Sequence, residues 1–78
     1  MVTPEEAKRW LAKIGGHWAE AKDQTPGMAR IVVTIERALG GSVSRHAAFD
    51  DRLTGYLREL AIREALANAC TELRGAIA

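Results

Sequence analysis

The chain has a single cysteine, Cys70, and therefore lacks any internal disulfide. Small secreted domains usually strengthen a thin core with several disulfides, so we expect an intracellular, cytoplasmic protein. The two histidines, His17 and His46, show no metal-ligand spacing, and we predict no metal and no other cofactor. Without such supports, 78 residues make a marginally stable domain, which favours oligomerisation or a larger protein partner.

An excess of one charge is also lacking, since 11 lysines and arginines face 10 aspartates and glutamates. A dominant non-specific nucleic-acid binder normally carries a clear basic excess, so this balance argues against that class. No run of 18 apolar residues exists, and we predict neither a membrane span nor a membrane partner. A secretory signal begins with basic residues that are followed by an apolar segment. The first six residues instead contain two acids and no base, so we expect no secretory signal.

Motifs for catalysis are missing as well. A cysteine nucleophile needs a base in contact with it, and Cys70 has mainly apolar neighbours in the sequence. Asp50 and Asp51 are explained more simply by a favourable interaction with the dipole of a helix that begins near them. The two glycine pairs do not belong to phosphate-binding motifs. We therefore predict no catalytic residue and no enzymatic activity.

The N-terminal third reads as a helix. Thr3 is placed to cap it, Pro4 suits its first position, and Glu6 completes a capping box. Apolar side chains then recur on one helical face and keep their phase across the pair Gly15-Gly16. We predict one helix over residues 4–23, bent at the glycines, with a stop at Gly15 and a restart near His17 as the alternative. The face consists of Ala7, Trp10, Leu11, Ile14, Trp18 and Ala21.

A second helix is predicted after a turn at residues 24–27. Residues 31–35 are all β-branched, which favours a strand, but consecutive Ile31, Val32 and Val33 interrupt the strict alternation of a strand. The pair Gly40-Gly41 is typical of a helix end. Apolar residues at helical spacing support the helix: Met28, Ile31, Val32, Ile35, Ala38 and Leu39.

The last third predicts a long helix with two apolar stripes whose centres differ by roughly 140° around the axis. Either this helix breaks near Ala61, or its second stripe meets something outside the domain. The first stripe consists of Phe49, Leu53, Tyr56, Leu57 and Leu60. The second consists of Ile62, Leu66, Ala69, Leu73 and Ile77.

Together these elements predict a single all-α domain over residues 1–78, a small three- or four-helix bundle. The first stripe is expected to pack on the preceding helices, and the second to form a protein interface. Trp10 and Trp18 are added as candidate anchors, because tryptophan is enriched at binding hot spots. The predicted function is a non-enzymatic protein-binding module, a small adaptor, regulator or inhibitor. It is expected to act as a homodimer or on a larger partner.

An alternative function is a nucleic-acid-binding regulator with a helix-turn-helix-like segment over residues 28–60. Ser44, Arg45, His46 and Arg52 are its candidate contacts. If the last helix is continuous, Arg45, Arg52, Arg63 and Arg74 form a row that would suit phosphates. The acidic pair Asp50-Asp51 and the balanced charge count against this alternative.

Overall fold

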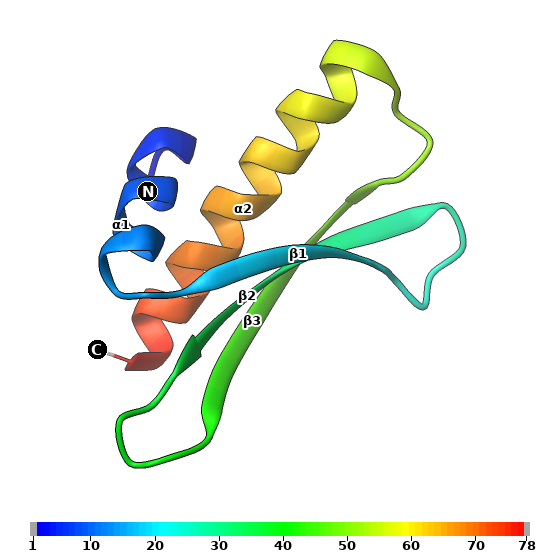
Figure 1. Cartoon of the computed structure of the whole chain (residues 1–78). Coiled ribbons are helices and arrows are strands. Elements are labelled where there is room, and N and C mark those ends of the chain that lie inside the picture. Colours follow the sequence, from blue (N-terminus) through cyan, green and yellow to red (C-terminus); the bar gives the residue numbers. More distant parts are fainter. Residues whose placement is uncertain (1, 78) are drawn as a thin grey trace.

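The computed structural model describes residues 2–77 and shows an α+β fold (Figure 1). Helix α1 (Pro4–Lys13) is followed by strands β1 (His17–Lys22), β2 (Met28–Glu36) and β3 (Ser42–Asp50), and then by helix α2 (Gly55–Ile77). The strands form one antiparallel sheet in the order β1-β2-β3. The predicted all-α helical bundle is therefore wrong.

Strand β2 replaces the predicted second helix. Ala29, Ile31 and Val33 are buried on the helix side of the sheet, and the residues between them lie on the opposite side. The β-branched run suits a pleated strand, and β1 and β3 both pair with it along the backbone. In the sequence, Val32 breaks the alternation of apolar and polar residues that marks a strand. In the structure it lies half-buried on the open face of the sheet, between Ala19 and His46.

The predicted first helix is too long, because α1 ends before the glycine pair. Its start is as predicted, since Thr3 Oγ1 accepts a hydrogen bond from the Glu6 N–H (3.2 Å). At its end Gly15 adopts a φ of +73°, and the Gly16 N–H donates to the Leu11 carbonyl (2.9 Å). These contacts form a Schellman cap. The chain then continues as strand β1, so His17 and Trp18 do not belong to a helix.

The second glycine pair forms a hairpin turn rather than a helix end. Gly40 and Gly41 adopt φ values of +97° and +80°, which favour glycine. The Arg37 N–H donates to the Gly41 carbonyl (3.0 Å) and closes the β2–β3 connection. The chain returns as β3, so residues 42–50 form a strand and not the beginning of the long helix.

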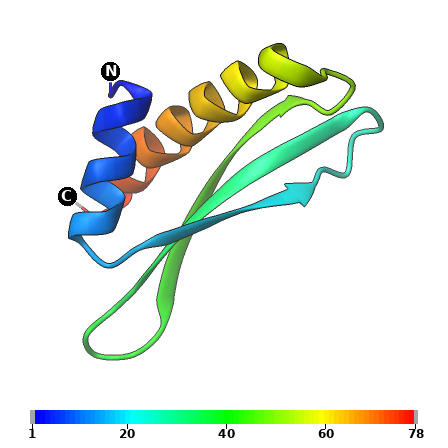
Figure 2. The same ribbon diagram turned by 45° about the horizontal axis from the view of Figure 1, so that its top comes forward.

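Both helices lie on one side of the sheet (Figure 2). Helix α2 packs on β2 and β3, whereas α1 packs mainly against α2. Cys70 Sγ on α2 lies 4.0 Å from the Ala7 carbonyl on α1. The Arg74 guanidinium on α2 lies 5.4 Å from the centre of the Trp10 ring on α1. Within residues 2–77, no element covers the other face of the sheet.

The core lies between the sheet and α2, with α1 closing one side. Its members share nearly complete burial and come from all elements except β1. They are Ala7, Leu11, Ala29, Ile31, Val33, Val43, Phe49, Ala65, Leu66, Ala67, Ala69, Cys70 and Leu73.

The close contact between Gly16 and the core gives a stability prediction. A Cβ atom at Gly16 would lie 2.5 Å from Leu11 Cδ1 and 3.0 Å from Ile35 Cγ2. We expect Gly16→Ala to lower the free energy of unfolding by about 1–3 kcal/mol, because buried Leu11 has little room to move. The measurement is urea unfolding followed by circular dichroism.

Gly75→Ala is the matched control, because no atom lies within 4 Å of a Cβ built there in α2. It should leave stability unchanged or raise it by up to about 1 kcal/mol. Equal stability of Gly16→Ala and the wild type would contradict the close packing of the α1–β1 turn.

Candidate interaction surface

Helix α2 is continuous from Gly55 to Ile77, so no break occurs near Ala61. The second stripe and the last three residues of the first stripe therefore lie on this helix, but with exchanged roles. Leu66, Ala69 and Leu73 are 0% exposed and lie in the domain's own core. Ile62 is half-buried, and Ile77, at the end of the helix, is 39% exposed. Most of the side chains expected at an interface thus hold the two layers together.

The two most exposed large apolar side chains of α2 belong to the first stripe. Phe49 belongs to β3 and is buried, but Tyr56, Leu57 and Leu60 are 68%, 60% and 37% exposed. We call these three residues the α2 patch. They occupy the first two turns of α2, which project beyond α1 (Figure 1).

Contacts along α2 show why its first turns stay uncovered. The ion pair between Glu5 and Arg63 is the first of three contacts with α1. The other two join Ala7 to Cys70 and Trp10 to Arg74, further along the helix. These three contacts run along α2 from Arg63 to Arg74, and the residues of the α2 patch precede all of them.

Arg58 fixes the start of α2 on the sheet. Its Nη2 lies 2.8 Å from Glu20 Oε2, and its Nη1 lies 3.1 Å from Asp51 Oδ1. Its guanidinium also lies 5.3 Å from the centre of the Phe49 ring. The hydrogen bond to Asp51, followed by the attraction of both carboxylates, raises the pKa of Arg58. No local spacing in the sequence indicates Arg58, because its partners lie on β1 and in the turn after β3.

Arg58 also orients the α2 patch. At about 100° per residue, Leu57 and Leu60 lie roughly 100° and 160° around the helix from Arg58. Because Arg58 faces the sheet, these leucines point away from it. The patch is therefore an outward surface of the domain rather than an unfilled part of its core.

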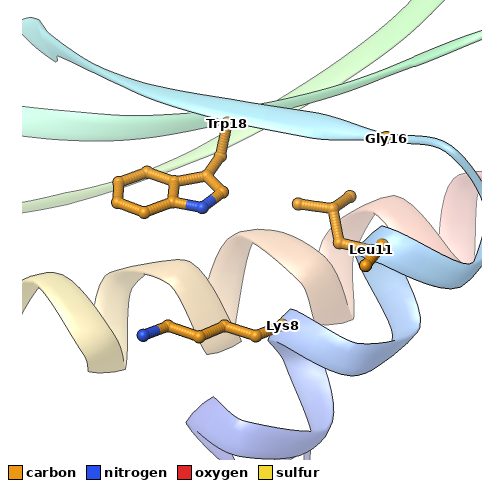
Figure 3. A pocket seen from close by; sticks show the side chains of 5 residues that line it. Lys8, Leu11, Gly16 and Trp18 are labelled. Carbon is orange, nitrogen blue, oxygen red and sulfur yellow. The ribbon is translucent and has the colours of Figure 1, made fainter.

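The two tryptophans lie on different elements and do not form one anchor. Trp10, on α1, is half-buried beside Arg74. Trp18, on β1, is 42% exposed and faces the helix side of the sheet, where it lines a hollow with Lys8 and Leu11 (Figure 3). The predicted helix placed Leu11 and Trp18 on one face but left Lys8 outside it, whereas the turn after α1 brings all three residues to the same hollow.

The four candidate nucleic-acid contacts do not share a surface. Ser44 and His46 lie on the open face of the sheet, and Arg45 lies on the opposite side of the same strand. Arg52 follows the strand, and its Nε lies 3.0 Å from Asp50 Oδ1. Its side-chain hydrogen bonds lower the pKa of Asp50.

The predicted arginine row is also absent, because it required one helix from Arg45 to Arg74. Arg45 belongs to β3, and Arg52 lies in the connection to α2. On α2, Arg63 pairs with Glu5, and Arg74 lies over Trp10. These guanidinium groups support contacts within the domain rather than a phosphate track.

The side chains with reactive chemistry are dispersed. Cys70 is fully buried, and burial raises the pKa of its thiol, so the thiolate is disfavoured. Over residues 2–77, no three His, Cys, Asp or Glu side chains come together as a metal site. No helix in the same range is long and apolar enough to cross a bilayer.

Comparisons of the chain with protein-family models, with curated proteins and with solved structures found no match. No relative therefore supplies a partner or a site residue for this chain. The α2 patch and the Trp18 hollow are two surfaces within residues 2–77 whose geometry fits a binding role.

The exchanged roles of the two stripes can be tested by one pair of substitutions on α2. Leu66→Ala should lower the free energy of unfolding by about 2–5 kcal/mol, because it empties a fully buried site. Leu57→Ala should change it by less than about 0.5 kcal/mol, because Leu57 is mostly exposed. Urea unfolding at a low protein concentration measures both. Equal losses would contradict the assignment of the core face.

The buried thiol gives a second prediction. Cys70 should react with a thiol reagent such as Ellman's reagent only after urea unfolding, because it is buried and its raised pKa keeps it protonated. Rapid labelling of the native protein would show that α1 does not cover this part of α2.

Proposed function

We propose that this protein is a non-enzymatic protein-binding module that self-associates through the α2 patch. The observation that carries the proposal is the exposure of Tyr56, Leu57 and Leu60 on one projecting helix end. Single exposed apolar residues are ordinary, whereas a contiguous group on a rigid element is typical of an interaction site. The small size of the chain adds support, because association buries surface that a domain of 78 residues cannot bury alone.

The charges around the patch favour a second copy of the chain as its occupant. Leu57, Leu60 and exposed Glu64 follow one another on one side of α2. If two copies of α2 pack antiparallel about a centre between Leu57 and Leu60, Glu64 of each copy lies beside the start of the other helix. That start has no acidic residue in its first turn, and its free N–H groups favour a carboxylate. A twofold interface repeats this contact.

The expected association is weak. Fully burying a leucine-sized side chain contributes about 1.5–3 kcal/mol, and association costs about 4–15 kcal/mol in lost freedom. Three partly exposed side chains from each copy offset only part of this cost or slightly more than it, so we expect a weak dissociation constant of roughly 1 µM to 1 mM. Such a dimer forms and separates with changes in concentration, as suits a small adaptor, regulator or inhibitor.

The cytoplasm is part of the same proposal. Cys70, the single cysteine, is a free thiol in the structure, in keeping with a reducing compartment. The dispersed arginines give no comparable support to the nucleic-acid alternative, so self-association is the function proposed.

Sedimentation equilibrium over a wide concentration range tests the proposal. The wild type should shift from monomer to dimer, and Leu57→Glu combined with Leu60→Glu should remain monomeric. The double variant should keep the wild-type circular dichroism spectrum, because neither leucine belongs to the core cluster.

Asn68→Glu combined with Thr71→Glu is the matched control, since it adds two charges at exposed positions further along α2. This control should dimerise as the wild type does. A wild type that stays monomeric throughout, or a leucine double variant that still dimerises, would contradict the proposal.

A further inference from the structure

The helix side of β1 is largely uncovered, and this leaves a hollow beside it. Helix α2 lies on β2 and β3, and α1 packs on α2 rather than on β1. A hollow of about 340 Å³ opens between α1 and the start of β1 (Figure 3). Its volume lies near the lower end of ligand sites, which span roughly 300–1,000 Å³, so a short chain end fits better than a long segment. Its lining consists of Lys8, Leu11, Ala12, Gly16 and Trp18.

Two hydrogen-bond donors face this hollow. Figure 3 shows the nitrogen edge of the Trp18 indole pointing into it and the Lys8 side chain running along the opposite wall. Among the side chains the structure describes, the four ion pairs use Arg52, Arg58 and Arg63, and none uses Lys8. The indole N–H of Trp18 likewise makes none of the side-chain hydrogen bonds within residues 2–77.

The rest of the lining is apolar. Leu11 forms the inner wall, Ala12 adds a methyl group, and the six-membered ring of Trp18 presents a flat apolar surface. A fitting ligand therefore combines an apolar side chain with a negatively charged hydrogen-bond acceptor a few bonds away. The last residue of a polypeptide has this combination, since its side chain and its terminal carboxylate share one Cα atom.

We propose that the Trp18 hollow binds the C-terminal residue of a partner polypeptide whose last side chain is apolar. The terminal carboxylate accepts hydrogen bonds from the Lys8 ammonium and the Trp18 indole N–H. The apolar side chain packs against Leu11 and the indole ring. This site is separate from the α2 patch and does not depend on self-association.

The neighbouring acids leave Lys8 available. A second hollow continues from the first and is lined by Glu5, Lys8, Glu59, Ile62 and Arg63. Glu5 is already paired with Arg63, and no ion pair joins Glu59 to Lys8. Glu59 is the acid of this second hollow that none of these ion pairs uses, so Glu59→Gln should preserve or strengthen carboxylate binding.

The test follows the indole N–H resonance of Trp18 in the ¹⁵N-labelled wild-type protein. The probe is acetyl-glycyl-alanyl-leucine with a free C-terminal carboxylate, and the control is the same peptide as its amide. A Trp10→Phe variant shows which of the two indole resonances belongs to Trp18. The binding measurements themselves use the wild-type protein. The acid peptide should shift the Trp18 resonance saturably, and the amide should bind about tenfold more weakly, as expected for the loss of one charge-assisted hydrogen bond.

Two variants locate the carboxylate. Lys8→Met should weaken binding of the acid peptide about tenfold and leave binding of the amide unchanged. Lys13→Met should have no effect, because Lys13 is an exposed lysine at the end of α1 outside the hollow. Equal affinity for acid and amide, an unshifted Trp18 resonance, or equal effects of the two lysine variants would overturn the proposal. The Leu57→Glu and Leu60→Glu double variant should bind the peptide normally, which separates this test from that of self-association.

Discussion

The packing of β2 against α2 is the interaction on which the rest of this structure depends. Ile31 and Val33 project from the middle strand toward Leu66 and Leu73 of the helix, and all four side chains are 0% exposed. They are four of the five largest fully buried side chains in the described part of the chain. Burying each contributes about 1.5–3 kcal/mol to the stability of a small domain without disulfides. Strands β1 and β3 satisfy the backbone of β2 on its two sides, and α1 closes the core at Ala7 and Leu11.

Both proposed surfaces arise because the two helices differ in length and because α1 packs on α2 rather than on the sheet. Helix α2 has 23 residues and α1 has 10, so they extend about 34 Å and 15 Å. The shorter helix cannot cover the first turns of the longer one, and the α2 patch remains exposed there. Because α1 packs on α2, it also leaves the inner side of β1 open, where Trp18 faces the hollow. An apolar helix end and an aromatic hollow thus follow from the same arrangement.

Local signals in the sequence predicted the ends of elements better than their type. The Thr3 cap and the turn at residues 24–27 are present, and the last helix is present but begins only at Gly55. The two glycine pairs do end elements: Gly15-Gly16 follows helix α1, whereas Gly40-Gly41 connects two strands instead of ending a helix. Trp18 was misleading, because its spacing of eight residues from Trp10 fits a helical face by coincidence. The β-branched run of β2 was a correct strand signal that the half-buried Val32 obscured.

The candidate surface could be predicted only in part, for a physical reason. The two stripes on the last helix were visible, yet the sequence could not show which one faced the core. That choice depends on where a sheet lies, and the sheet pairs residues far apart in the chain. The Trp18 hollow and the Arg58 contacts depend on the same long-range pairing, so no local spacing indicates them.

The most direct test of the central claim is the backbone conformation of β2 in solution. Backbone chemical shifts and nuclear Overhauser effects from a uniformly labelled protein would report it for Met28–Glu36. The structure predicts extended shifts throughout and cross-strand contacts from Ile31 to both Glu20 and Ala47. Helical shifts with sequential amide contacts over the same residues would contradict the fold, and with it both proposed surfaces.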